Sequence, residues 1–173
     1  MEKKLFILFA VAGILFGSAV FAQCDDYQMQ IQNAVNGFYE LSDNVFEANV
    51  LIDKLIQDPN SENFDETLDE LKLFIKAIND NVDILDADLA IALSNAEMCY
   101  CRNGQKQTFM LIDDLESIGD YVKPILKLIK DAKKASGDKL ISILEQIDSS
   151  LAELSEIATK TPEECIIATE ACN

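Results

Sequence analysis

Apolar residues recur along four segments of the chain at alternating steps of four and three residues. The average step of 3.5 residues is typical of α-helices that pack against one another as in a coiled coil. The segments span residues 27–55, 64–99, 111–132 and 140–158. The pattern therefore predicts four long helices, each with one apolar face.

Residues that cap helices or form turns separate these segments, as expected for long helices joined by short loops. Asn and Asp are favoured at helix N-termini, and Gly at turns and helix C-termini. The residues concerned are Pro59 and Asn63 before the second segment and Glu66 within its first turn, Asn103 and Gly104 before the third, and Gly137 and Asp138 before the fourth. Asn63 with Glu66 has the spacing of a capping box, Asn103-Gly104 predicts a turn, and Asp138 predicts the cap of the last helix.

Two prolines lie within or after the helical segments. The apolar spacing continues across Pro124, which predicts a kinked helix rather than a loop. Thr161, Pro162 and Glu164 have the order of a capping box with proline at the first helical position. We therefore expect a short, separate tail helix at the C-terminus.

Long helices joined by short loops run antiparallel to their neighbours, so the predicted fold is an all-α, up-down-up-down four-helix bundle with a tail helix. This topology brings the start of the first helix, the end of the second and the region after the fourth to the same end. All five cysteines lie in these regions: Cys24, Cys99, Cys101, Cys165 and Cys172. We expect disulfides to tie the bundle at that end.

The pairing of the cysteines is only partly predictable. We expect Cys24 to bond to Cys99 or Cys101, and the other member of that pair to bond to Cys165 or Cys172. Because five is an odd number, one thiol is left over, and it is a candidate for an intermolecular disulfide. A four-cysteine metal site is the alternative, but an oxidising destination argues against it.

Residues 1–22 have the features of a secretory signal peptide. Two lysines precede an apolar run from Leu5 to Ala22, and Val20 and Ala22 are small residues suited to a cleavage site. The mature chain would then be a single acidic domain of residues 23–173, located in the periplasm, the extracellular space or a secretory granule. An uncleaved membrane anchor is the alternative interpretation.

The composition excludes several functions. The chain has 31 Asp and Glu against 14 Lys and Arg, a net charge of −17, and no histidine. This charge disfavours nucleic acid and anionic membranes as partners. Without histidine there is no Ser-His or Cys-His catalytic unit, and no carboxylate pair is distinguished, so we expect no enzyme activity and no cofactor. The spacing of an EF-hand is absent, and we expect at most weak, diffuse Ca²⁺ binding.

One stretch departs from the acidic background. Four lysines follow the helical steps 4-3-4 and lie along one stripe: Lys123, Lys127, Lys130 and Lys134. One interpretation is that they offset the helix dipole and pair with acidic neighbours. The other is that they form an interaction stripe that binds an acidic strip on another copy.

These features favour a secreted, non-enzymatic interaction protein, an inhibitor or ligand-like bundle that binds a protein partner through its surface. A structural matrix or storage protein is the alternative, self-assembling through helices, counterions and an intermolecular disulfide. A carrier of an apolar ligand is a third hypothesis. After signal cleavage we expect no contact with membranes.

Overall fold

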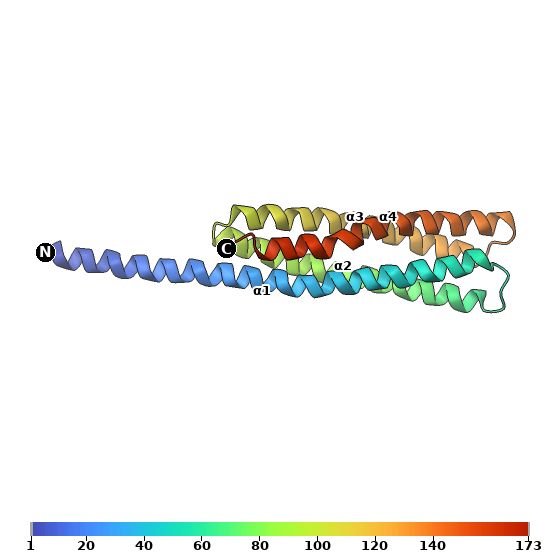
Figure 1. The fold of residues 1–173 in the computed structure, drawn as a ribbon, viewed down its shortest axis with the longest axis horizontal. Coiled ribbons are helices and arrows are strands. Elements are labelled where there is room, and N and C mark those ends of the chain that lie inside the picture. The colour runs from blue at the N-terminus through green and yellow to red at the C-terminus, as the bar shows by residue number, and fades with distance from the viewer. Residues whose placement is uncertain (1, 173) are drawn as a thin grey trace.

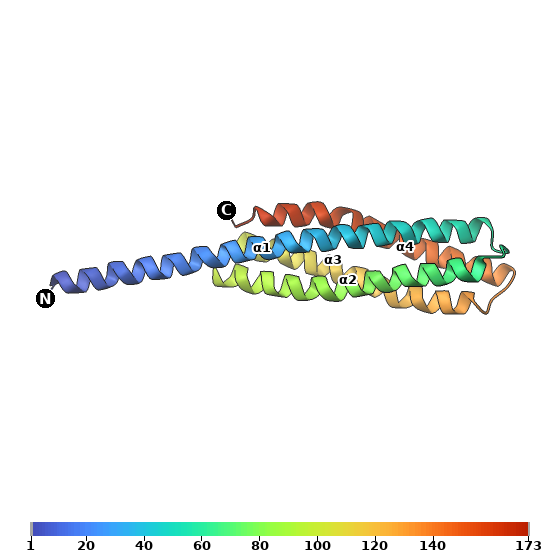
Figure 2. The same cartoon turned by 90° about the horizontal axis from the view of Figure 1, so that it is seen from below.

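Four long α-helices form the fold, as the apolar spacing predicted. The computed structural model describes the backbone of residues 2–172 and the side chains of residues 24–172. The helices are α1 (Glu2–Gln57), α2 (Phe64–Met98), α3 (Arg102–Ala132) and α4 (Asp138–Thr169). They lie along one another as a rod, and the N-terminal part of α1 projects beyond it (Figures 1 and 2).

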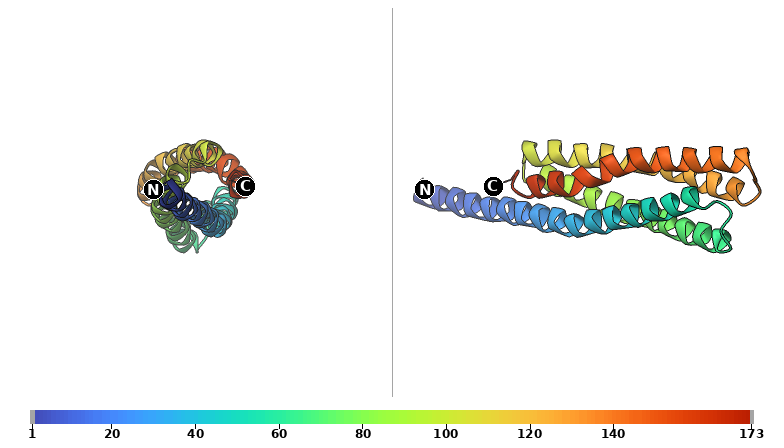
Figure 3. Two further views of the ribbon diagram at one scale, coloured as in Figure 1. Left: turned by 90° about the vertical axis from the view of Figure 1, so that its left-hand side faces the viewer. Right: turned by 45° about the vertical axis from the view of Figure 1, so that its right-hand side comes forward.

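The helices form an antiparallel ring in which each one packs against two others. α1 and α3 each contact α2 and α4, and the end-on view shows the four helices arranged around a common axis (Figure 3). Short loops reverse the chain between consecutive helices. The topology is therefore up-down-up-down, and α2, with 35 residues, is about 50 Å long at 1.5 Å per residue.

The predicted apolar faces form the core. The apolar residues that follow the four-three spacing are buried in one continuous cluster, with three exceptions. Cys99 is buried but outside the cluster, and Phe64 and Val82 are half-buried at its edge. Phe38, Leu71 and Leu151 illustrate the pattern, since their side chains are completely inaccessible to solvent. Burying apolar surface along the whole rod is the main force that holds the helices together.

Pro124 lies inside α3 with helical residues on both sides, as the continuous apolar spacing predicted. The separate tail helix, in contrast, was a wrong prediction. α4 is continuous from Asp138 to Thr169 and includes Pro162. Thr161 is buried, and its hydroxyl donates to the carbonyl oxygen of Ala158 instead of capping a new helix.

Of the two predicted helix caps, Asn63 lies at the N-cap position without the expected side-chain bond, and the prediction of Asp138 as a cap was wrong. Asn63 precedes α2, but its φ of −97° and ψ of 11° differ from the extended conformation that lets a side chain cap, and it makes no cap hydrogen bond. Gly137, with φ +60°, takes the N-cap position of α4. Asp138 is therefore the first residue of the helix, where its carboxylate favours the positive end of the dipole.

The turn expected at Asn103-Gly104 lies earlier in the chain. α3 already begins at Arg102, so both residues belong to its first turn. The chain reverses at Tyr100, which has a φ of +60°. Gly104 is instead required for packing, because a Cβ atom there would lie 2.4 Å from the Cys172 sulfur.

The predicted signal peptide falls on the part of α1 whose side chains lie outside the described residues. Its cleavage stays a prediction.

Candidate functional site

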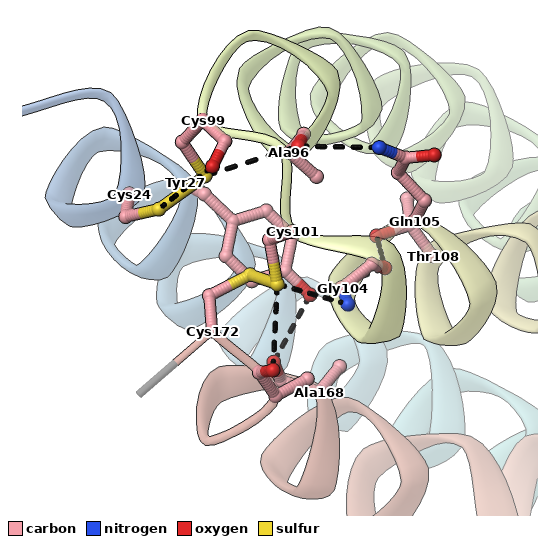
Figure 4. Close-up of a disulfide and its surroundings, with 11 residues drawn as sticks. Cys24, Tyr27, Ala96, Cys99, Cys101, Gly104, Gln105, Thr108, Ala168 and Cys172 are labelled. Carbon is pink, nitrogen blue, oxygen red and sulfur yellow. Dashed lines mark hydrogen bonds between the residues drawn. A yellow bond between two sulfur atoms is a disulfide. The ribbon is translucent and has the colours of Figure 1, made fainter. Parts of the chain in front are cut away.

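Four of the five cysteines lie close together and form two disulfides (Figure 4). Cys24 bonds to Cys99, with 5.5 Å between their Cα atoms, and Cys101 bonds to Cys172, with 5.6 Å. The pairing agrees with the expectation that the two cysteines around Tyr100 have different partners. Together the bonds connect α1 with α2 and α3 with α4 at one end of the bundle.

A buried hydrogen-bonded cluster lies beside the disulfides. The Tyr27 hydroxyl donates to the carbonyl oxygen of Ala168 at 3.0 Å, and the Thr108 hydroxyl donates to the carbonyl oxygen of Gly104 at 2.8 Å. Burial raises the pKa of Tyr27. Because the hydroxyls of Tyr27 and Thr108 are both bonded to main-chain carbonyls, the cluster joins helices and offers no free catalytic group.

Cys165 is the remaining cysteine, and it is completely buried. Its Sγ lies 3.5 Å from the carbonyl oxygen of Ile31, and burial raises its pKa to about 12. The thiol therefore stays protonated and out of reach of another molecule. This corrects the expectation of an intermolecular disulfide, since the other four cysteines are bonded within the chain.

The structure bears directly on the four-cysteine metal site that was the alternative to disulfides. Among residues 24–172, no three His, Cys, Asp or Glu side chains come together in a way that could hold a metal ion. The four-cysteine alternative fails because four of the five thiols are consumed in disulfides.

Three lysines of the stripe lie on the outward face of α3, and Lys134 lies in the turn just after the helix. Lys123, Lys127, Lys130 and Lys134 are all exposed. In the part of the chain with described side chains, the lysines in ion pairs are Lys133 and Lys160, which lie off the stripe. Among the described residues, the stripe's charges are therefore not neutralised by acidic neighbours within 4 Å, so the expected ion pairs are not formed, while the effect on the helix dipole stays a prediction.

Two lysines outside the stripe form ion pairs with acidic residues of an adjacent helix. Lys133 contacts the carboxylate of Asp69, and this hydrogen bond lowers the pKa of Asp69. Lys160 binds Asp114 at 3.0 Å between α3 and α4, and that bond raises the pKa of Lys160. Each of these lysines faces an adjacent helix, whereas the stripe faces solvent.

The exposed face of α3 continues towards its N-terminus with acidic residues that sequence reasoning missed. Asp113, Glu116 and Asp120 are exposed and follow the same 4-3 alternation, which leads without a break into Lys123. One helix face thus carries an acidic half followed by a basic half. Their spacing could have identified these acidic residues in the sequence. It was overlooked because acidic residues are abundant throughout the chain.

A shallow hollow of about 470 Å³ lies between α2 and α3, next to the boundary between the two halves. It exists partly because Gly119 has no side chain to fill it. The lining residues are Asn79, Val82, Asp83, Glu116, Gly119, Asp120 and Lys123. The centre of the charged face is therefore recessed.

Comparison of the chain with protein-family models, curated proteins and solved structures gave no match. The two disulfides indicate an oxidising, extracytoplasmic environment. Over residues 24–172, no helix is apolar over a stretch long enough to cross a membrane.

Proposed function

We propose that the protein is a secreted, non-enzymatic interaction protein that binds another protein through the exposed face of α3. The observation that carries this proposal is the row of four exposed lysines without ion-pair partners, on a chain with a net charge of −17. Like charges in a row repel one another. An acidic partner surface would relieve that repulsion and would fix the orientation of the complex.

Binding rather than catalysis is supported by what the polar groups do. The chain has no histidine to act as a base. The buried hydroxyls of Tyr27 and Thr108 bond to main-chain carbonyls, and the Cys165 thiol is held protonated. No nucleophile of this buried cluster has a neighbouring base.

The location we propose is the extracellular space, the periplasm or a secretory granule. The predicted signal peptide in residues 1–22 and the two disulfides both support export from the cytoplasm.

A structural role through self-association is the second candidate function. It is favoured by the acidic half of the α3 face, because one copy then carries both a basic stripe and an acidic strip of the same spacing. Without the intermolecular disulfide, such assembly would depend on reversible surface contacts.

The proposal can be tested by affinity capture with the mature chain, residues 23–173. Wild-type protein, the stripe variant K123E/K127E/K130E/K134E and the control variant K54E/K72E/K76E/K139E are immobilised separately. Each is exposed to secretions of the protein's own source, and bound proteins are identified by mass spectrometry.

The two variants change the net charge equally, but the control substitutions lie outside α3. We expect a partner that wild type and control retain and the stripe variant loses. Equal capture by all three proteins would contradict the proposed role of the stripe.

A further inference from the structure

The outward face of α3 has a charge pattern that is complementary to itself when reversed. Asp113, Glu116 and Asp120 occupy the N-terminal half, and Lys123, Lys127 and Lys130 the C-terminal half, all exposed. Steps of four and three residues place them on one line along the helix. The line from residue 113 to residue 130 is about 25 Å long at 1.5 Å per residue.

We propose that this face binds a second copy of the chain, with the two α3 helices antiparallel across a twofold axis. This inference rests on the proposed function, and it identifies the protein partner as a second copy of the chain. A twofold contact uses the same surface on both molecules, so the surface must be complementary to itself. The charge-split face of α3 meets this condition.

The spacing specifies the register. With the axis between residues 121 and 122, Asp120 faces Lys123 of the second copy, Glu116 faces Lys127, and Asp113 faces Lys130. Each step along one helix matches an equal step in the opposite direction along the other, so the pairs form at the same height. By symmetry each pair occurs twice. A parallel arrangement in the same register would place like charges together, which disfavours it.

Features at the end and the centre of the face fit this register. Phe109 continues the line towards the N-terminus and is 51% exposed. In the same register it faces the turn that follows α3 in the second copy; this turn carries Lys134, and a lysine ammonium binds favourably over an aromatic ring. At the centre, the hollow beside Gly119 leaves room for side chains of the second copy.

The overall acidity does not prevent this contact. Without the predicted signal, which holds two lysines and one glutamate, each copy has a net charge of −18. At physiological ionic strength, however, repulsion between exposed charges is screened beyond about 8 Å. The opposite charges of the α3 face meet at shorter range. We therefore expect a reversible dimer, closed by its symmetry rather than extended into a polymer.

Charge reversal tests the proposal by sedimentation equilibrium of mature protein at physiological ionic strength. The variant D113K/E116K/D120K has a fully basic face, K123E/K127E/K130E has a fully acidic face, and the six-fold variant exchanges the two halves. We expect wild type and the six-fold variant to dimerise, and each three-fold variant alone to dimerise about tenfold more weakly or not at all. A mixture of the two three-fold variants should form the dimer again.

Net charge cannot account for that pattern, because the six-fold variant has the same net charge as wild type. The control K54E/K76E/K139E changes net charge as much as the acidic-face variant, but outside α3, and should dimerise like wild type. Recovery in the mixture also shows that the three-fold variants are folded.

Several outcomes would overturn the proposal: a monomeric wild type up to about 1 mM, dimerisation of the acidic-face variant at wild-type strength, or no association in the mixture. If wild type is monomeric but captures a different protein through its lysines, the proposed function stands and the second copy is rejected as its partner. If capture does not depend on the lysines either, both are rejected.

Discussion

The Thr161 hydroxyl donates a hydrogen bond of 3.2 Å to the carbonyl oxygen of Ala158, which lies four residues before Pro162. In a regular helix the N–H of residue 162 would bind that oxygen, but proline has no N–H. Thr161 and Pro162 are both buried, so water cannot easily replace the missing donor. The threonine side chain therefore supplies the hydrogen bond that allows α4 to continue through the proline.

Removing this hydroxyl should destabilise the protein. We expect Thr161→Val to lower the free energy of unfolding by about 1–2 kcal/mol, because the Ala158 carbonyl would be left buried and unpaired. Pro162→Ala in the same background should restore part of the loss by providing an N–H. Urea unfolding measures both. Thr159→Val is the matched control, since the Thr159 hydroxyl binds the Ser155 carbonyl on an exposed part of the helix; equal losses at the two positions would contradict the explanation.

Two glycines of α3 should respond to alanine with opposite signs. At Gly104 a Cβ atom would lie 2.4 Å from the Cys172 sulfur and 3.0 Å from Tyr27 Cζ, and the disulfide restricts how far that sulfur can move. We expect Gly104→Ala to cost about 1–3 kcal/mol. At Gly119 the nearest atom, Val82 Cγ1, is 3.7 Å away, so Gly119→Ala should add about 0.5–1 kcal/mol through helix propensity. Stability changes of the same sign in thermal unfolding would show that the contacts at Gly104 are not decisive.

The buried thiol of Cys165 should not react with thiol reagents until the protein unfolds. Cys165 is inaccessible, and its pKa of about 12 keeps it protonated at pH 8. Ellman's reagent should detect no thiol in the native protein and one per chain in denaturant without reductant. The variant Cys165→Ser should give no signal in either state. Rapid labelling of native wild type would mean that α4 opens around Cys165.

Glu164 should make stability depend on pH. One of its carboxylate oxygens is buried without a hydrogen-bond partner among the described residues, and burial, together with Asp114, raises its pKa above the ordinary 4.5. A raised native pKa means that the folded state binds the proton more tightly, so this stability is present below pH 4.5 and is lost as pH rises through the native pKa.

We therefore expect Glu164→Gln to raise the melting temperature at pH 7 and to leave it unchanged near pH 3.5. Glu163→Gln, at the exposed neighbouring position, is the control. A loss of stability at pH 7 would show that the ion pair between Glu164 and Lys160, at 3.9 Å, outweighs the burial of the charge.

The apolar spacing predicted the helices and their core because burial repeats with the period of the helix, as at Phe38 and Leu71. Residues that typically form turns or helix caps predicted the local structure less reliably. Gly104 belongs to a dipeptide that usually forms a turn, but its role is set by Tyr27 and Cys172, which are distant in sequence. Contacts of this kind form only in the assembled bundle, so the sequence near Gly104 does not predict them.

On the candidate surface, the lysines were predicted from the sequence but the acidic residues were not. Basic residues are outnumbered in this chain, 14 Lys and Arg against 31 Asp and Glu, so the clustered Lys123 and Lys127 stand out from the acidic background. Asp113 and Glu116 resemble the many other acidic residues. Only their place on the exposed face of α3, in line with the lysines, distinguishes them.

The two disulfides also determine what happens when the backbone is cut. Cys24–Cys99 closes the hairpin of α1 and α2, and Cys101–Cys172 closes the hairpin of α3 and α4. Covalently, the chain from Cys24 to Cys172 is a figure of eight whose two rings are joined through Tyr100. A protease that cleaves the loop at 58–63 or 133–137 opens a ring but releases no fragment. The nicked molecule keeps all four helices tethered until a reductant cleaves the disulfides.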